Sequence, residues 1–158
     1  MGNVVSFYKL ARKKKRENKK RDFKTTREGH PLLFLNLFLT RNQANMLKRI
    51  FTSQFKVHAD HRKDYVMVLK STLKALNQTT TSSGACFSIH VYEIYYFEQI
   101  IDFEMDMYKE NYNMLDMLII EELTDMINSF KENNKEYITE FTSITGSEKH
   151  RVLTEVFR

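Results

Sequence analysis

The sequence contains little of what rigid frameworks and catalytic loops are built from. Among its 158 residues there are one cysteine, one proline and four glycines. The single cysteine, Cys86, excludes a disulfide framework within the chain and a zinc site built on several cysteines. So little proline and glycine argues against low-complexity disorder. The chain also has no glycine-rich phosphate loop and no nucleophile elbow, so we expect neither an enzyme nor a cofactor or small-molecule substrate.

Long hydrophobic runs are missing as well. A helix needs about 20 predominantly apolar residues to cross a bilayer, and the longest apolar run here, Pro31 to Leu39, is interrupted by Asn36. Hydrophobic residues nevertheless make up 42% of the composition, and aromatic residues make up 13%. This is enough for the core of one domain at this length. We therefore expect any contact with a membrane to be peripheral.

Charge is distributed unevenly along the chain, although the net charge is only +5. Residues 1–30 hold eleven Lys/Arg and three Asp/Glu, and residues 31–97 hold eight and three. Residues 98–140 reverse the balance with three and twelve, and residues 141–158 hold three and two. A basic front and an acidic back can be two solvated faces that keep the protein soluble. They also allow one side to face an anionic surface, or copies to associate head to tail.

The first six residues match the signal for N-myristoylation, in which glycine follows the initiator methionine and serine or threonine stands at position six. Gly2 and Ser6 occupy those positions, and no charged residue precedes Lys9. A basic block follows, made of Lys13, Lys14, Lys15, Arg16, Lys19, Lys20 and Arg21. One myristoyl chain holds a protein on a membrane only weakly, so stable anchoring needs a second signal such as a polybasic patch. The two motifs together predict acylation at Gly2 and binding of anionic lipid by the basic block.

The same block permits a second interpretation. Residues 13–16 and 19–21 form a two-part basic cluster typical of nuclear import or of an RNA-binding arm. Two basic helix faces could add phosphate contacts, through Arg41, Lys48, Arg49, Arg62, Lys63, Lys70 and Lys74. No zinc-finger spacing and no aromatic RNA-recognition signature accompanies them. This alternative therefore predicts a nuclear protein, or one that binds nucleic acid without sequence specificity and in a salt-sensitive way.

The N-terminal layout resembles that of small viral matrix proteins, in which a myristoylated glycine and a polybasic segment precede a compact domain. The resemblance rests on residues 1–21 alone, and residues 31–158 add nothing to it. It implies a non-enzymatic peripheral protein on the cytosolic leaflet of a membrane. It also implies self-association beneath that membrane and contact with RNA or a nucleoprotein.

The sequence Gly29-His30-Pro31 interrupts regular structure and marks the expected domain boundary. Before it, residues 1–30 form a basic tail that we expect to be disordered, or helical only on binding, because its like charges repel. After it, residues 31–158 are expected to form one small α+β domain, with short antiparallel strands packed against about three helices.

Hydrophobic periodicity supplies the expected elements of that domain. An apolar run predicts a strand over 32–39, and Thr40 with Gln43 predicts a capping box for a helix over 41–55. Helical spacing predicts two further helices, over 61–76 and 113–131. Alternation of apolar and polar residues predicts strands over 86–96 and 99–108. A terminal hairpin is expected from 137–144 and 150–157, with a helix from Ser147 as the alternative.

Two groups of side chains have the residue types of a metal site. His58, Asp60 and His61 lie within four residues, but no further ligand stands at a recognised spacing, so we expect a helix start capped by Asp60 and no metal. Three carboxylates, at Asp102, Glu104 and Asp106, would share one face of the predicted strand, about 7 Å apart. They could bind a divalent cation, dock the basic front of a neighbouring subunit, or form the solvated face of a half-buried strand.

Overall fold

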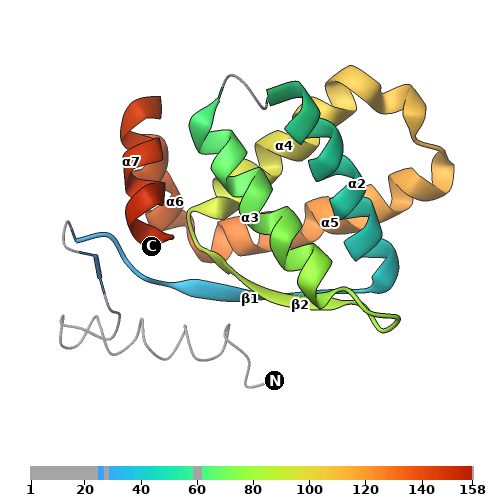
Figure 1. Ribbon diagram of the computed structural model, residues 1–158, viewed down its shortest axis with the longest axis horizontal. Helices are drawn as coiled ribbons and strands as arrows, with labels where there is room; N and C mark the ends of the chain where they lie inside the picture. The colour runs from blue at the N-terminus through green and yellow to red at the C-terminus, as the bar shows by residue number, and fades with distance from the viewer. Residues whose placement is uncertain (1–24, 27–28, 59–61, 158) are drawn as a thin grey trace.

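Helices account for most of the residues that the computed structural model describes, which are 25–26, 29–58 and 62–157. In this part of the chain, six α-helices and one short 3-10 helix accompany a two-stranded antiparallel sheet (Figure 1). The predicted α+β class is therefore confirmed, although twice as many α-helices form as expected. Most of the predicted tail, including residues 1–24, lies outside the described residues.

The sheet pairs β1 (Phe34–Leu39) with β2 (Ala85–His90), and alternation gives it one buried and one exposed face. The buried face is made of three cross-strand pairs, Leu35–Ile89, Leu37–Phe87 and Leu39–Ala85. On the other face, Phe34 and Phe38 remain exposed. The helices stand on one side of this sheet, which runs along the lower edge of the molecule in Figure 1.

Both predicted strands near this sheet form, with shorter bounds. The strand expected over 32–39 begins two residues later, and the strand expected over 86–96 ends at His90. A glycine fixes the start of β2. Gly84 has a φ of +123°, and a Cβ at this position would lie 2.1 Å from the carbonyl oxygen of Leu39. Only glycine fits there without moving the backbone.

Two predicted helices form next in the chain, α2 (Arg41–His58) and α3 (Lys63–Thr79), and they pack against each other. The predicted capping box of α2 is confirmed: the Gln43 amide donates to Thr40 Oγ1 at 3.1 Å, and the Thr40 amide donates to Gln43 Oε1 at 3.0 Å. The expected cap of α3, Asp60, lies outside the described residues.

The strand predicted over 99–108 is wrong, because helix α4 (Glu93–Tyr108) occupies this stretch. The alternating pattern counted Phe103 and Met107 among the inward residues, but both are exposed. The buried residues instead recur at helical spacing, as Ile94, Phe97, Ile100, Ile101 and Glu104. A buried glutamate among them disguises the helical period, because sequence patterns treat every carboxylate as outward.

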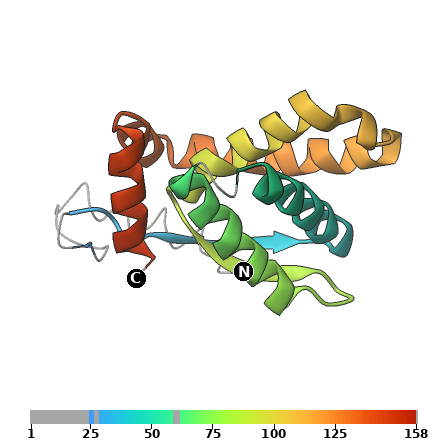
Figure 2. The same ribbon diagram turned by 45° about the horizontal axis from the view of Figure 1, so that its top comes forward.

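Helix α5 (Met114–Asn133) confirms the helix predicted over 113–131, and the 3-10 helix η1 (Lys109–Asn111) joins it to α4. A capping box starts it: the Asp116 amide donates to Asn113 Oδ1 at 2.8 Å, and the Asn113 amide donates to Asp116 Oδ2 at 3.0 Å. Figure 2 shows α4 and α5 side by side as a helical hairpin whose tip, at η1, lies at the end opposite α7.

The prediction of a terminal hairpin is wrong, and the alternative prediction of a final helix is confirmed. Two helices form, α6 (Lys135–Thr142) and α7 (Gly146–Val156). Their buried residues are Tyr137, Ile138 and Phe141 in α6 and Lys149, Val152, Leu153 and Val156 in α7. The apolar members recur at intervals of one, three and four residues, which fits a helix and not a strand.

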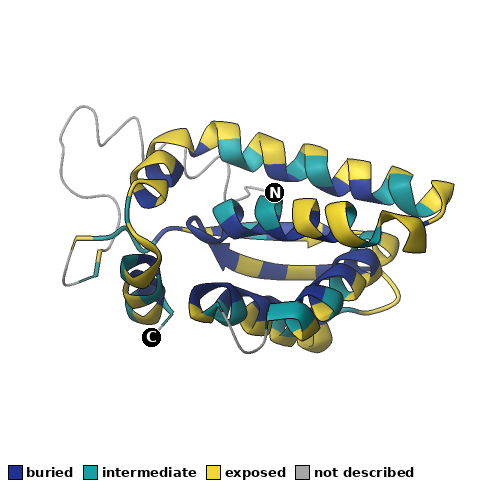
Figure 3. Ribbon diagram, turned by 90° about the horizontal axis from the view of Figure 1, so that it is seen from above, coloured by how far each residue is buried: buried dark blue, intermediate teal, exposed yellow. Residues whose placement is uncertain are grey.

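The core lies between the sheet and the inward faces of the helices, which appear as dark blue stripes in Figure 3. Aromatic rings link distant parts of it: Tyr92 stacks on Phe141 with ring centroids 4.5 Å apart, and Phe51 meets Phe97 edge to face at 5.0 Å. None of the helices in the described parts of the chain is both long enough and apolar enough to cross a membrane.

Candidate anion-binding site on helices α2 and α3

One face of α2 is a stripe of basic and small polar side chains. The opposite face of α2 points inward, because Ala44, Leu47, Ile50 and Phe51 are buried against the rest of the domain. The side chains at intervals of three and four residues on the other side therefore point outward. They are Arg41, Asn45, Lys48, Arg49, Thr52 and Lys56.

A shallow hollow of about 460 Å³ lies on this face, lined by Asn45, Lys48, Arg49, Thr52, Ser53 and Lys56. Its lining combines three cations with two hydroxyl groups and one amide, and carries no carboxylate. Ammonium, hydroxyl and amide groups all donate hydrogen bonds to phosphate oxygens. The chemistry of the hollow therefore suits a phosphate group or another anion.

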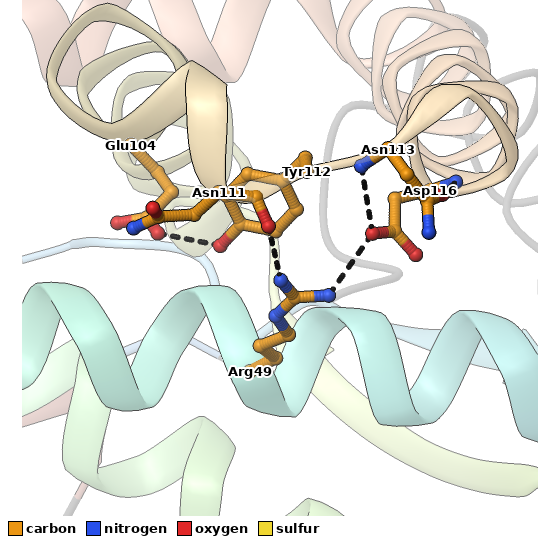
Figure 4. A network of polar contacts seen from close by, with 6 residues as sticks. All are labelled: Arg49, Glu104, Asn111, Tyr112, Asn113 and Asp116. Atoms are coloured by element: carbon orange, nitrogen blue, oxygen red, sulfur yellow. Dashed lines mark hydrogen bonds and ion pairs between the residues drawn. The ribbon is translucent and has the colours of Figure 1, made fainter.

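Arg49 connects α2 to the residues around η1 and the start of α5 (Figure 4). Its guanidinium donates to Asp116 Oδ2 at 3.2 Å and to the Asn111 carbonyl oxygen at 2.6 Å, and it lies 4.3 Å from the centre of the Tyr112 ring. These contacts tie α2 to η1 and to the start of α5. Because Asp116 balances its charge, Arg49 is less available to a ligand than the lysines beside it.

A buried polar network adjoins this contact through Tyr112. It includes Glu104 and Tyr112, both drawn in Figure 4, and also Gln54. Glu104 accepts hydrogen bonds from Gln54 Nε2 at 2.8 Å and from the Tyr112 hydroxyl at 2.5 Å. Burial, followed by the hydrogen bond to Glu104, raises the pKa of Tyr112 above its ordinary value. With both carboxylate oxygens of Glu104 accepting hydrogen bonds, the network joins α2 to the hairpin formed by α4 and α5.

The cations that remain for a ligand lie along both helices. On α2 they are Arg41, Lys48 and Lys56, and on α3 they are Lys63, Lys70 and Lys74. None of these six forms an ion pair or side-chain hydrogen bond with another residue in the described part of the chain. On α3 the intervals of seven and four residues place all three lysines on one face. We call these two sets the basic stripes.

The structure changes the predicted set of phosphate-contacting residues in three places. Arg49 and Arg62 are engaged by carboxylates: Arg62 lies 3.7 Å from Asp64 and 4.2 Å from the centre of the Tyr65 ring. Lys56 was missed, because the predicted helix ended at residue 55. The signal for it was present in the sequence, since Lys56 continues the helical interval of four residues from Thr52.

The residues predicted to bind lipid or nucleic acid in the tail are not among those that the structure describes. They are Gly2, Lys13, Lys14, Lys15, Arg16, Lys19, Lys20 and Arg21. Their roles therefore remain predictions from the sequence.

The structure describes only part of the first group of candidate metal ligands and separates the members of the second group. Of the first group, His58 is described, and its Nε2 lies 3.1 Å from Gln54 Oε1, whereas Asp60 and His61 lie outside the described residues. In the second group, the row of three carboxylates on one strand face does not exist. Asp102 and Asp106 are exposed on α4, and Glu104 is buried. Within the described ranges, no three His, Cys, Asp or Glu side chains come together as metal ligands.

Two further buried ionisable groups lie where β2 joins α4, and burial disfavours the charged form of each. His90 Nε2 lies 2.6 Å from the Pro31 carbonyl oxygen, and the Tyr92 amide donates to Nδ1 at 3.1 Å, so Nε2 carries the proton. Burial lowers the pKa of His90 to about 4. Glu93 accepts from the His90 amide at 2.7 Å, and burial raises its pKa to about 8. These contacts fix the junction between β2 and α4.

Comparison with models of protein families, with curated proteins and with solved structures found no match.

Proposed function

We propose that this chain is a non-enzymatic peripheral membrane protein that is N-myristoylated at Gly2, binds anionic lipid on the cytosolic leaflet and associates with itself there. The observation that carries the proposal is the direct succession of the acylation motif and the basic block within residues 2–21. Each feature supplies what the other lacks, because an acyl chain alone binds reversibly and basic residues alone bind only through screened charge.

The acyl chain and the basic block each contribute free energy to membrane binding, and the two contributions add. A single myristoyl chain gives an association constant of about 10⁴ M⁻¹, and each Lys or Arg close to an anionic surface adds about 1 kcal/mol. The basic block supplies seven such side chains. The unpaired cations of the basic stripes support the proposal, because they give the folded domain its own groups for contact with an anionic surface.

Vesicle co-sedimentation of the full chain, acylated by co-expression with a myristoyl transferase, tests the proposal. We expect binding to vesicles that contain phosphatidylserine, weaker binding to pure phosphatidylcholine, and a loss as salt rises. Gly2→Ala should lower the affinity by more than about tenfold, because the acyl chain is lost. If Gly2→Ala sediments with vesicles as the wild type does, the acyl anchor is refuted.

The contribution of the folded domain needs a matched pair of variants. Lys70→Glu with Lys74→Glu reverses two charges on α3, and we expect it to lower the affinity about tenfold or more. Lys109→Glu with Lys135→Glu makes the same charge change at exposed lysines outside the basic stripes. If the two double variants lose the same vesicle affinity, the loss reflects net charge alone, and the basic stripes do not contact the membrane.

A second candidate function is binding of nucleic acid together with nuclear import, and the two-part cluster in residues 13–16 and 19–21 favours it. It makes the opposite prediction for Gly2→Ala, because binding to RNA would survive that substitution. It would also show a steep salt dependence and collapse when residues 13–16 are neutralised. Nuclear exclusion of both wild type and Gly2→Ala would count against it.

A further inference from the structure

The start of α5 exposes large apolar side chains that a helix ordinarily buries. Met114 is 82% exposed, Leu115 is 71% exposed and Leu118 is 54% exposed, and Met107, at the end of α4, is 50% exposed. The capping box formed by Asn113 and Asp116 fixes this turn as helix. We call these four residues the apolar tip. Met114, Leu115 and Leu118 are neighbours on one helix, and exposed apolar neighbours of this kind are typical of interaction sites.

The surface next to the apolar tip is acidic. Beyond Leu118, the outward positions of α5 carry Glu121, Glu122, Asp125 and Glu132. Glu122 accepts a hydrogen bond from Gln43, and the other three have no cationic partner in the part of the chain that the structure describes. We call these four the acidic row. Because like charges repel, neither an anionic membrane nor the same face of a second copy fits this surface.

The partner that does fit is apolar at one end and basic along the rest. This chain contains one such stretch, residues 7–21, in which Phe7, Tyr8 and Leu10 precede the basic block. The order along the chain is the same in both partners, since α5 also begins with its apolar residues and continues with its charges. Apolar residues can therefore meet apolar residues, and cations can meet carboxylates, when the two run parallel.

The direction of the chain is compatible with this contact within one molecule. Figures 1 and 2 show α5 beginning at the tip of the α4–α5 hairpin and ending near α6, at the opposite end of the molecule. The described chain begins, in blue, toward that second end, where Thr25 pairs with Pro31. A segment parallel to α5 thus finishes on the side where the chain enters the domain. Attachment within one chain raises the effective concentration of the segment at α5 when the connecting residues span the distance between them.

We propose that residues 7–21 dock on the outward face of α5 of the same chain, with Phe7, Tyr8 and Leu10 on the apolar tip and the basic block along the acidic row. This contact is distinct from the membrane contact proposed above and uses the same basic residues. One segment cannot occupy both surfaces at once. In solution, the docked basic block is therefore not available to bind lipid. An anionic membrane competes with α5 for the same basic residues.

Photo-crosslinking of the full chain identifies the occupant directly, without lipid. The photoreactive residue p-benzoylphenylalanine replaces Leu118 in one preparation and Phe38 in the other, two side chains that are 54% and 53% exposed. We expect position 118 to crosslink to peptides from residues 7–21, and position 38 not to do so. Equal yields of these peptides from both positions, or none from position 118, would overturn the proposal.

A mixture of ordinary and nitrogen-15-labelled copies decides which molecule supplies the segment. Docking within one chain predicts crosslinked products of a single isotopic composition. Products that join labelled and unlabelled copies at the frequency of random mixing would overturn docking within one chain.

Tryptic cleavage inside residues 13–21 provides a second measurement. Docking protects these sites, and Leu115→Ser with Leu118→Ser should speed cleavage by about fivefold or more through loss of exposed apolar contact area. Because both positions are exposed, the domain should keep its helical circular dichroism. The matched control, Phe38→Ser, should leave the cleavage rate unchanged. An unchanged rate in the leucine variant would contradict docking.

Competition with lipid separates this proposal from the membrane function. Vesicles containing phosphatidylserine should abolish the crosslink at position 118 under conditions where the protein sediments with them. A crosslink that persists in sedimented protein would overturn the competition. Crosslinks without any binding to vesicles would leave the docking intact and refute the membrane function alone.

Discussion

The two halves of the domain carry opposite net charges, and many of their described charged side chains have no ion-pair partner among the described residues. Residues 31–97, which include α2, α3 and the first turn of α4, have eight Lys/Arg against three Asp/Glu, whereas residues 98–140, which include the rest of α4 and α5, have three against twelve. Among the described residues, few polar side-chain contacts join the two halves. On the surface, Arg49 pairs with Asp116, and Gln43 donates to Glu122. In the interior, Gln54 donates to Glu104.

A fold selected only for stability would interleave these charges, because separated like charges repel one another. Here six cations on α2 and α3, and three carboxylates of the acidic row, have no partner of opposite charge among the described residues. The comparison therefore indicates two surfaces for two kinds of partner, one anionic and one cationic. The following substitutions test the contacts that join the halves and the buried groups of each.

Loss of the buried hydrogen bonds to Glu104 should lower the free energy of unfolding more than any other substitution considered below. Glu104→Ala removes the acceptor of both Gln54 and Tyr112 and leaves a cavity. We expect the free energy of unfolding to fall by about 3–4 kcal/mol, because two buried donors lose their partner. Urea denaturation measures this change. The control, Asp106→Ala, removes an exposed carboxylate from the same helix and should change stability by less than about 0.5 kcal/mol. Equal effects would show that the link is not what joins the halves.

The buried carboxyl group of the basic half should give a pH dependence of intermediate size. Burial raises the pKa of Glu93 from its ordinary value of 4.5 to about 8, so the folded state binds this proton more tightly than the unfolded state. Its contribution to stability is thus fully present below pH 4.5 and is lost as the pH rises toward 8. We expect a loss on the order of 2–4 kcal/mol across this window.

Glu93→Gln isolates that effect, because glutamine still accepts from the His90 amide but does not titrate. The difference in unfolding free energy between the variant and the wild type should grow with pH. His90 acts in the opposite direction in both proteins: its pKa is lowered from 6.5 to about 4, so its contribution is lost as the pH falls through that range. A difference that stays constant from pH 4.5 to 8 would contradict the role of Glu93.

The surface ion pair between Arg49 and Asp116 should contribute least to the free energy of unfolding. The side chains of Arg49 and Asp116 are 46% and 19% exposed, so solvent screens their attraction. With the contact to the Tyr112 ring included, we expect Arg49→Ala to lower the free energy of unfolding by about 1 kcal/mol. Thermal melts can measure this against Lys48→Ala, which removes an unpaired neighbouring cation and should have almost no effect. A larger loss in the Lys48 variant would reverse this assignment.

The sequence was sufficient where local chemistry decides the structure. Thr40 and Gln43 specify the start of α2 by themselves, and the apolar run that ends at Leu39 was sufficient to predict β1 as a strand. The stretch 99–108 was misread because the burial of Glu104 depends on Gln54 and Tyr112, which lie elsewhere in the chain. Sequence periodicity cannot reveal that donors outside this stretch, one of them 50 positions away, make a carboxylate suitable for the core.

The same limit applies to the candidate site. The outward cations of α2 and α3 followed from helical spacing, and most of them lie where the spacing put them. The sequence did not show that Asp116, 67 positions away, engages Arg49. Nor did it predict the apolar tip: Met114, Leu115 and Leu118 have the spacing of core residues, and only the packed fold shows that nothing in the described domain covers them.

The most direct test of the central claim, acylation of Gly2 beside a basic block, is the intact mass of the protein purified from eukaryotic cells. We predict loss of Met1 and a gain of about 210 Da, the mass that a fourteen-carbon acyl chain adds. An unmodified or merely acetylated N-terminus would contradict the acyl anchor. Binding of nucleic acid and nuclear import would then become the leading account of the basic block.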